Sequence, residues 1–334
     1  KYKNKSFGTP ITAIKYNGNE YKVQQLDEAS RGKVASDDCL AGMIGKGSTE
    51  SAIKNCMNYG PYYSKGDDVG GMVGYISGGK VLNCITHFFA QNESSRELLA
   101  SIGLNNVTIS GDTRFDRVLA IKEQSKQLPV VDAFKDGRNA FVAGSSWQPD
   151  EQIFIPYMSD KLPEWKLIIA PHVIAEEHLK QIDSLLEGRK VVRYTVAKEA
   201  LESGDEARIN AMVEELKDAD ALIINCFGLL SSIYRYGEVA YVGGGFGVGI
   251  HNVLEAAVWN MPVIFGPNHE RFQEAMQLKA EKGGFAINNA EDFADIMTSF
   301  TSGPDALATA SKQAGNYVKC QSGATDIILQ NVKL

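Results

Sequence analysis

The chain has 334 residues, of which 44% are hydrophobic and 22% are charged, and its formal net charge is −7. This length and composition predict a globular protein of two or three domains. The negative net charge argues against a broad basic surface, so we expect no nucleic-acid partner. No run of about 18 apolar residues is present and no signal peptide opens the chain, so the sequence predicts no membrane span.

Cysteine usage indicates a reducing compartment. The chain contains five cysteines, an odd number, and no C-x-x-C motif, which does not fit a disulfide framework. We expect each cysteine to be a small buried hydrophobic residue, and we assign no metal site and no cofactor. The five positions are Cys39, Cys56, Cys84, Cys226 and Cys320.

Residues 1–86 have the pattern of a Gly-rich β-repeat segment. Asp38–Gly45 is echoed by Asp68–Gly74, and Ala52–Cys56 is echoed by Lys80–Cys84. The offsets indicate a repeat of about 28 residues, and short β-runs between Gly-rich turns predict a parallel β-solenoid or a small β-sandwich. These units resemble the glycine-rich GLUG repeats of bacterial surface proteins. Two such units hardly bury a core alone, so we expect the segment to pack on a neighbour or to be partly disordered.

From His87 onward the sequence alternates between strand and helix patterns. We assign residues 87–138 to the remnant of an amino-terminal domain, followed by a connector. The expected elements, in chain order, are a strand at Phe88–Gln91, a helix at Glu93–Ile102, a strand at Val107–Ser110, a loop at Gly111–Asp116 and a polar connector at Lys122–Asn139.

Residues 139–334 predict a doubly wound parallel sheet of the α/β class. Continuous apolar strands that alternate with helices are typical of a parallel sheet covered on both faces. Strands are expected at Ala140–Ala143, Lys166–Ala170, Val191–Tyr194, Ala221–Ile224, Glu238–Val242 and Pro262–Phe265. Helices are expected at Asp150–Asp160, Ile174–Leu186, Leu229–Tyr234, His251–Asn260 and Arg271–Lys282. In such sheets ligands bind beyond the carboxyl ends of the strands, so a site is expected in the loops there.

The most informative loop follows the strand at Glu238–Val242, where five glycines precede the helix expected at His251–Asn260. The glycines are Gly243, Gly244, Gly245, Gly247 and Gly249. Glycines let the backbone approach a ligand closely, and the N–H groups and positive end of the following helix then form a phosphate site. The alternative is tight helix–sheet packing without a ligand.

The turn after the first strand of this sheet contains Gly144, Ser145 and Ser146. Its N–H and hydroxyl groups are donors suited to an anion, so we expect it to bind the ligand. The alternative is a plain helix cap, in which Ser146 or Asp150 satisfies the first-turn N–H groups of the next helix.

Two other strand ends are candidates. His172 follows the strand at Lys166–Ala170 and places an imidazole at the mouth of the site, although a lone histidine is more often structural. Gly228 lies in the turn Asn225–Leu230, whose backbone groups suit the edge of a nucleobase. The alternative for this turn is a simple strand-to-helix connection.

The helix after the five glycines carries His251, Asn252 and Glu255, and His251 and Glu255 share one face at positions i and i+4. Glu255 stands in the apolar run Val-Leu-Glu-Ala-Ala, where an unpaired buried carboxylate is costly. We expect it to accept hydrogen bonds from a ribose diol. Asn268 and Glu274 follow the next strand and are expected near the same rim, with a solvated helix start as the alternative.

No catalytic residue can be assigned from motifs. The chain has no Ser-His-Asp order with a nucleophile elbow, no H-E-x-x-H and no Walker loop. The site is therefore expected to hold a nucleotide-linked group while another molecule attacks it.

Several segments together resemble the bacterial 3-deoxy-D-manno-octulosonic acid (Kdo) transferases, particularly those of the Bacteroidetes type. The segments are Phe88–Glu93, Ile109–Asp116, Val142–Ser146, Ile169–His172, Gly243–Ala257 and Pro262–Glu274. They occur in the family's order, and the resemblance covers about residues 85–334. The run Gly-Gly…His-Asn-x-Leu-Glu-Ala is the most specific of them.

The resemblance implies a two-domain glycosyltransferase of the GT-B fold that moves Kdo from CMP-Kdo to a lipid A precursor, with inversion and without a metal cofactor. The carboxyl-terminal half would hold the donor, and the amino-terminal half would hold the acceptor, with the protein in the cytoplasm at the inner-membrane surface. By motif match, the donor-facing residues are Gly144, Ser145, Ser146, His172, the loop Gly243–Gly249, His251, Asn252 and Glu255. The loop would anchor the phosphate, and Glu255 would contact the ribose.

The chain departs from this family in its first part. The family's first domain carries an Ala-Ser-x-Gly-Glu segment whose glutamate is assigned as the general base. Here the similar segment is Glu28–Lys33, with Lys33 at the position of that glutamate, and its β-repeat surroundings indicate a chance similarity. Asn225 also stands where the family usually has Asp. We therefore expect a donor site in a chain that transfers Kdo poorly or not at all.

Two other functions fit parts of the sequence. A UDP-sugar 2-epimerase of the same fold also combines a glycine loop with an inward glutamate. Alternatively, the repeats indicate a non-enzymatic surface protein in which the α/β part is a scaffold, although the cysteine pattern argues against secretion.

Overall fold

The computed structural model describes residues 85–332, together with the backbone of six short strands between residues 13 and 77. The chain divides into two compact units, residues 1–108 and 109–334. Some side chains named in the sequence predictions lie outside the described residues. They are those of Lys33, Cys39, Cys56 and Cys84.

Short strands in the first unit pair at the spacing of the expected repeat. The strands are β1 (Ala13–Tyr16), β2 (Asn19–Lys22), β3 (Cys39–Ala41), β4 (Ile44–Ser48), β5 (Asp68–Gly70) and β6 (Val73–Ser77). β1 and β2 pair antiparallel, whereas β3 pairs with β5 and β4 with β6 in parallel. Cys39 lies opposite Asp68 and Ile44 opposite Val73, so both parallel registers join positions 29 residues apart. This register matches two stacked copies of one repeat.

The first unit continues with β7 (Phe88–Ala90), α2 (Glu93–Ser101) and β8 (Val107–Ile109), which confirms the strand, helix and strand expected there. Asn92 has an extended backbone, and its side chain accepts a hydrogen bond from the N–H of Ser95 at 2.9 Å. This N-cap satisfies one first-turn N–H group and sets the start of α2. β7 and β8 form a two-stranded sheet.

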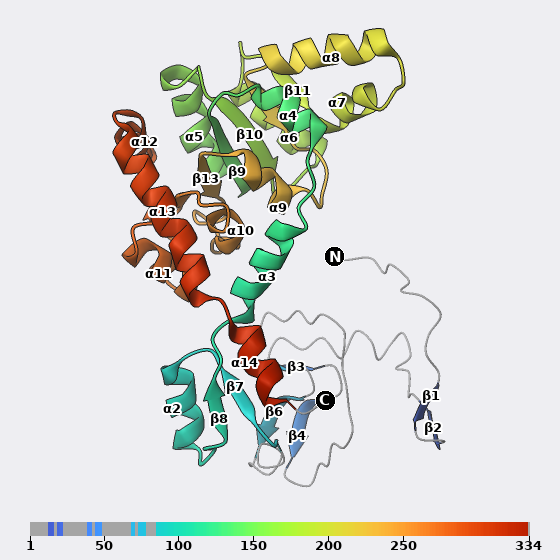
Figure 1. Ribbon diagram of the computed structural model, residues 1–334, viewed down its shortest axis with the longest axis vertical. Helices are drawn as coiled ribbons and strands as arrows, with labels where there is room; N and C mark the ends of the chain where they lie inside the picture. Colours follow the sequence, from blue (N-terminus) through green and yellow to red (C-terminus); the bar gives the residue numbers. More distant parts are fainter. Residues whose placement is uncertain are drawn as a thin grey trace. The chain divides into compact units, whose positions relative to one another are not determined.

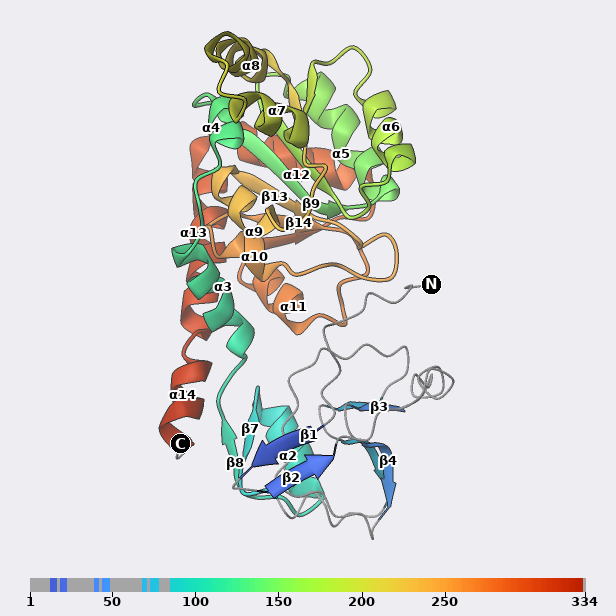
Figure 2. The same ribbon diagram turned by 90° about the vertical axis from the view of Figure 1, so that its right-hand side faces the viewer.

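The second unit is built on a seven-stranded sheet in which all neighbours are parallel. Its strands are β9 (Ala140–Ser146), β10 (Lys166–Pro171), β11 (Val191–Arg193), β12 (Ala221–Ile223), β13 (Val239–Val242), β14 (Val263–Phe265) and β15 (Gly284–Ala286). The strand order is β11-β12-β10-β9-β13-β14-β15, and helices cover both faces (Figure 1, Figure 2). The predicted doubly wound parallel α/β class is confirmed, and β15 was not expected.

The apolar residues of these strands alternate between two cores, one on each face of the sheet. The helices are α3 (Thr113–Glu123), α4 (Pro129–Lys135), α5 (Gln148–Lys161), α6 (Glu176–Leu185), α7 (Tyr194–Leu201), α8 (Glu206–Asp218), α9 (Leu230–Ile233), α10 (Leu254–Ala257), α11 (Gln273–Ala280), α12 (Ala290–Thr301), α13 (Pro304–Gln321) and α14 (Ala324–Asn331). Val142 and Ile168 share a core with α4, α7 and α8, whereas Phe141 and Ile169 share one with α5, α6 and α12. Because both faces are covered, most residues of the strands are apolar.

The segment Gly111–Asp116, expected to be a loop, begins a helix instead. Asp112 is the N-cap of α3, and its side chain accepts a hydrogen bond from the N–H of Arg114 at 2.9 Å. A carboxylate at this position satisfies a first-turn N–H group. The Gly-Asp-Thr sequence therefore marks a helix start.

The segment Lys122–Asn139, expected to be a polar connector, contains α4. Pro129 occupies the first helical position, where its fixed φ and missing N–H are tolerated. Val130, Val131 and Phe134 are buried in the core that also contains α8. The helices α7, α8, α12, α13 and α14 were likewise not expected from the sequence.

α13 is the longest described helix, with 18 residues. Ala314, Tyr317 and Val318 on it are buried, whereas Lys312 and Lys319 are exposed. Within residues 85–332, no helix is both long and apolar enough to cross a membrane.

Candidate functional site

The order of the strands changes direction between β9 and β13. β10, which follows β9 in the chain, lies next to β9 on the side away from β13. β14, which follows β13, lies next to β13 on the side away from β9, so the connections after β9 and β13 run in opposite directions. The crevice between two such loops is the usual ligand site of an open parallel sheet. The residues predicted for the site all lie at or beyond the carboxyl ends of strands β9, β10, β12, β13 and β14. They are Gly144, Ser145, Ser146, His172, Gly228, Gly243, Gly244, Gly245, Gly247, Gly249, His251, Asn252, Glu255, Asn268 and Glu274.

The glycine loop, residues 243–249, packs directly on the turn after β9. The N–H of Gly243 donates to the carbonyl of Gly144 at 3.0 Å. A Cβ on Gly243 would lie 2.6 Å from Cα of Ser146, and a Cβ on Gly245 would lie 2.6 Å from Cα of Gly266. At these two positions close packing alone requires glycine.

Backbone conformation requires glycine at two further positions of the loop. Gly244 has a φ of 94° and Gly249 a φ of 138°, both in the left-handed region that side chains rarely adopt. The N–H of Gly249 donates to the carbonyl of Gly244 at 3.2 Å, and the N–H of His251 to that of Gly243 at 3.1 Å. Gly247 differs, because a Cβ there would meet one carbonyl oxygen at an ordinary 3.6 Å. The loop is therefore shaped by its own contacts before any ligand binds.

Asp150 ties the glycine loop to the start of α5. Its fully buried carboxylate accepts hydrogen bonds from the N–H of Trp147 (2.9 Å), the N–H of Gly244 (3.0 Å) and the hydroxyl of Tyr241 (2.8 Å). In the first of these, Asp150 binds the N–H of Trp147, the N-cap residue of α5, rather than the first-turn N–H groups named in the alternative prediction. The other two contacts were not predicted. Burial raises the pKa of Asp150, and the three donors oppose that rise. Asp150 thus holds the loop in place from inside the protein.

The two serines of the β9 turn take different roles. Ser146 is fully buried, and its hydroxyl donates to Oε1 of Glu151 at 2.8 Å. The same oxygen lies 3.0 Å from Nε2 of His178, while Oε2 of Glu151 has no hydrogen-bond partner within the described part of the chain. Burial raises the pKa of Glu151. Ser145, half-buried and at a φ of 52°, is therefore the serine left at the surface of the crevice.

Trp147, His172 and His251 form a stack of rings at the crevice. The ring of His172 lies 4.5 Å from that of Trp147 and 4.6 Å from that of His251, centroid to centroid, with interplanar angles of 23° and 24°. The indole N–H of Trp147 donates to Nε2 of His251 at 3.4 Å. Nε2 is then an acceptor, so the neutral His251 carries its proton on Nδ1.

The stack predicts a pH dependence of stability. Burial, and next the neighbouring His172, lower the pKa of His251 from its ordinary value of 6.5. The unfolded chain then binds this proton more readily, so the contribution of His251 to stability falls as the pH drops below about 6.5. We therefore compare the free energy of unfolding of the unmodified protein with that of His251→Gln, both measured in urea. Between about pH 7.5 and pH 5.5, we expect the unmodified protein to lose more stability than His251→Gln. A difference that does not change with pH would contradict this assignment.

The helix expected at His251–Asn260 is wrong in its extent, because α10 covers four residues. His251 precedes it, so His251 and Glu255 share no helix face, and so short a helix supplies little dipole for a phosphate. The side chain of Asn252 accepts a hydrogen bond from the N–H of Leu254 (3.1 Å) and donates one to Oε1 of Glu255 (3.1 Å). Glu255 is half-buried, and its carboxylate is oriented by Asn252.

Asn268 and Gly228 lie beyond the ends of β14 and β12. The N–H of Asn268 donates to the carbonyl of Gly245 at 2.9 Å, and its side-chain amide donates to that of Gly247 at 2.7 Å. Asn268 therefore braces the glycine loop. Gly228 is exposed with a φ of 87°, and nothing lies within 4 Å of where its Cβ would be. Its backbone conformation, rather than packing, requires glycine.

Glu274 is engaged in an ion pair. Its two carboxylate oxygens accept hydrogen bonds from the guanidinium of Arg114 at 2.8 and 3.1 Å. Arg114 also donates to Asp112, and these two carboxylates raise its pKa. The pair joins the start of α3 to the start of α11, so the carboxylate of Glu274 already has a structural partner.

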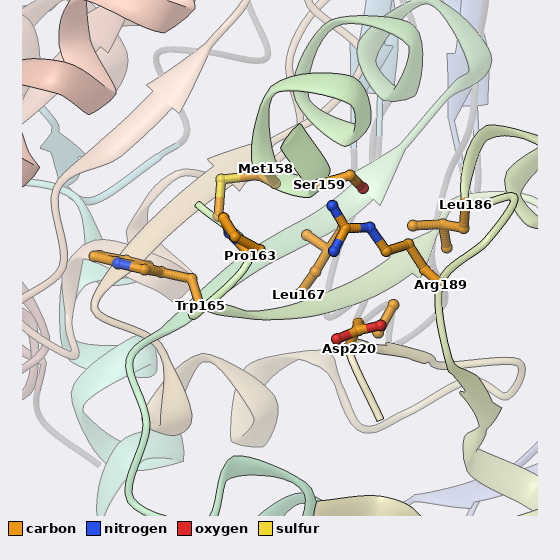
Figure 3. Close-up of a pocket in the computed structure, with 9 residues that line it drawn as sticks. Met158, Ser159, Pro163, Trp165, Leu167, Leu186, Arg189 and Asp220 are labelled. Carbon is orange, nitrogen blue, oxygen red and sulfur yellow. The ribbon is translucent and has the colours of Figure 1, made fainter. Parts of the chain in front are cut away.

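Two hollows of the second unit lie away from the predicted site. A cavity of about 10 Å³ lies at the amino ends of β10 and β12, next to Arg189 and Asp220 (Figure 3), and has room for about one water molecule. An open groove of about 690 Å³ lies between α3 and α14. No residue predicted for the site lines either of them.

Comparison with known proteins identifies relatives of the chain. No family model matches it. A 3-deoxy-D-manno-octulosonic acid transferase of Rickettsia prowazekii (strain Madrid E) is 21% identical over 228 residues, 68% of this chain and 47% of the relative. One of Aquifex aeolicus (strain VF5) is 33% identical over 87 residues, 25% of each chain. The chain is related to the Kdo transferases.

The chain spans about half the length of the Rickettsia relatives. Among solved structures, the C-terminal CMP-Kdo binding domain of WaaA from Acinetobacter baumannii has 18% identity and a TM-score of 0.45, over 61% of this chain and 97% of that one. Anabaena HepE in complex with UDP-glucose has 12% identity and a TM-score of 0.43, over 73% of this chain and 62% of that one. The fold class rests on the seven-stranded sheet itself.

The relationship to the Kdo transferases confirms the resemblance that the sequence segments indicated. Residues that shape the crevice but were not predicted for it are Trp147, Asp150 and Tyr234. Trp147 directly follows Gly-Ser-Ser, which is a usable signal. Asp150 was assigned only as a cap, and Tyr234 only as a helix end, because their contacts come from residues distant in sequence.

Proposed function

We propose that the second unit of this chain binds CMP-Kdo and that the protein is a Kdo glycosyltransferase of lipopolysaccharide synthesis. The observation that carries the proposal is that the predicted donor residues gather at one edge of a parallel sheet, in a chain that is related to the Kdo transferases. The crevice at the strand-order change is where an α/β sheet of this kind binds a nucleotide.

Several groups in the crevice suit a nucleotide-linked sugar. Ser145, unlike Ser146, is not committed to Glu151, and with the backbone of the glycine loop it offers donors to the phosphate. The carboxylate of Glu255, which Asn252 orients, would accept hydrogen bonds from the ribose hydroxyls. This arrangement binds and orients the donor and leaves the general base unassigned.

For the acceptor we propose a lipid A precursor, with the protein in the cytoplasm and peripheral to the inner membrane. We also propose that this chain transfers Kdo slowly, because the segment that carries the family's glutamate base is not recognisable in residues 1–86. A general base contributes about 10²–10⁴-fold to a rate. Kdo transfer to a lipid A precursor, followed by mass spectrometry, tests both proposals. Transfer as fast as that of the Rickettsia prowazekii enzyme contradicts the second.

Calorimetry with CMP-Kdo and UDP-GlcNAc tests the donor. We expect CMP-Kdo and CMP to bind and UDP-GlcNAc not to bind. Binding of UDP-GlcNAc alone would end the transferase proposal and favour the 2-epimerase. If neither nucleotide sugar binds, the result favours the alternative in which the α/β part is a scaffold of a non-enzymatic protein.

Replacing Glu255 with alanine is expected to weaken CMP binding by about 1–3 kcal/mol, because hydrogen bonds to a charged acceptor are lost. The measurement is calorimetry with CMP on both proteins. Glu164→Ala is the matched control, since Glu164 is an exposed glutamate just before the amino end of β10. Unchanged CMP affinity in a folded Glu255→Ala protein would refute the ribose role.

A further inference from the structure

The side chain of Tyr234 is buried beside Gly144, near the carboxyl end of β9. Tyr234 begins a 3-10 helix, η2 (Tyr234–Tyr236), and is 1% exposed. Its ring lies against Gly144, where a Cβ would come within 2.7 Å of Cζ and would overlap the hydroxyl. The hydroxyl is therefore at the carboxyl end of β9, beside the turn predicted to bind the donor.

The hydroxyl of Tyr234 forms no hydrogen bond with any described residue. Of the four other buried tyrosines of the same unit, three use their hydroxyls inside the protein, and the hydroxyl of Tyr194 has no hydrogen bond with a described residue. The three hydrogen bonds join Tyr241 to Asp150 (2.8 Å), Tyr236 to Asp132 (3.2 Å) and Tyr317 to Gln277 (2.9 Å). A buried hydroxyl without a partner is unfavourable, so a partner from outside the chain is expected.

The hydroxyl of Tyr234 keeps a small exposed area. Within residues 85–332, Oε2 of Glu151 is the one side-chain oxygen that is fully enclosed and has no hydrogen-bond partner. The hydroxyl of Tyr234 also has no partner, so it is not fully enclosed. Burial, and next the carboxylate of Glu255, raise the pKa of Tyr234. The hydroxyl therefore stays protonated and able to donate.

We propose that Tyr234 determines specificity for the ribose of the bound nucleotide by hydrogen bonding one of its hydroxyls, next to Glu255. This inference rests on the proposed function. A phosphate group beside Glu255 would be repelled by the carboxylate, whereas a ribose hydroxyl can donate to Glu255 and accept from Tyr234. Tyr234 and Glu255 together then select a ribonucleotide over a deoxynucleotide.

The test is calorimetry of CMP, 2′-deoxy-CMP and 3′-deoxy-CMP with the protein and with Tyr234→Phe. The unmodified protein is expected to bind CMP at least about tenfold more tightly than one of the deoxy nucleotides. In Tyr234→Phe that preference falls by about tenfold, because CMP loses the hydrogen bond and the deoxy nucleotide does not. Tyr157→Phe is the control, since its hydroxyl contacts Thr298 on α12, two turns along α5 from Asp150.

Each outcome decides between the possibilities. If the unmodified protein and Tyr234→Phe prefer CMP over the deoxy nucleotides equally, the inference is overturned and the proposed function stands. The same holds if the unmodified protein binds all three nucleotides equally. Binding of none of them overturns the proposed function and this inference with it. Tyr234→Phe is expected to melt at or above the temperature of the unmodified protein, because no internal hydrogen bond is lost. A clear drop in melting temperature would reveal an internal partner and overturn the inference.

Discussion

Replacing Asp150 with alanine is expected to lower the free energy of unfolding by about 3 kcal/mol. Its carboxylate accepts three hydrogen bonds, from Trp147, Tyr241 and Gly244, and the substitution leaves those donors unsatisfied in the interior. The same change releases the glycine loop from α5, so nucleotide binding is lost together with stability. Urea unfolding and calorimetry with CMP measure the two effects.

Asp150→Asn is the matched control for this prediction. The amide oxygen can accept the two backbone N–H groups, and the amide NH₂ can donate to the rotatable hydroxyl of Tyr241. We expect the asparagine variant to lose less than about half of the stability that the alanine variant loses. Equal losses in both variants would show that the negative charge, rather than the hydrogen-bond geometry, stabilises the loop.

Replacing Gly245 with alanine is expected to destabilise the protein by about 1–3 kcal/mol and to abolish nucleotide binding. The new Cβ would lie 2.6 Å from backbone atoms of Gly266, so two loops at the crevice must separate. Backbone atoms cannot rotate away as the end of a side chain can. Urea unfolding gives the loss of stability, and calorimetry gives the loss of CMP binding.

Gly247→Ala in the same loop is the comparison for Gly245→Ala. Its Cβ would meet a carbonyl oxygen at 3.6 Å, an ordinary contact, so we expect a change within about 0.5 kcal/mol and nearly normal binding. Similar behaviour of the two variants would mean that the loop adapts freely and that its tight packing on Gly266 is not required for binding.

The sheet and its two faces were predictable because each strand is covered on both sides. β9 contains the apolar run Ala140–Ala143 and β10 the apolar run Leu167–Ala170, and the strands expected at Ala140–Ala143 and Lys166–Ala170 fall within β9 and β10. α8 was missed for the opposite reason. It is largely exposed, and Met212 and Leu216 are its buried residues, which leaves a weak apolar pattern.

The site was predictable in its location and less so in its internal contacts. The carboxyl ends of parallel strands meet at one edge, so loops distant in sequence were expected together. The sequence did not reveal that Ser146 faces inward while Ser145 stays at the surface, because the left-handed conformation of Ser145 interrupts the alternation of the strand. It also did not reveal that Asp150 reaches Gly244, 94 residues away. Such contacts follow from the packed tertiary structure rather than from local pattern.

The helix expected at His251–Asn260 shows how propensity and structure diverge. Leu-Glu-Ala-Ala is a good helical sequence, and α10 forms there. Before it, Asn252 accepts the N–H of Leu254 and holds the chain in a turn. Local side-chain hydrogen bonding therefore shortened a helix that composition favoured.

The stack of Trp147 on His172 gives the crevice a built-in optical signal. Of the three tryptophans in the chain, Trp165 is in a core and Trp259 packs against one, so Trp147 is the indole that stands at the crevice. Its fluorescence depends on the imidazoles it touches and on the water at its exposed face. Occupancy of the crevice changes that face directly, so the emission of the native protein reports filling without any added dye.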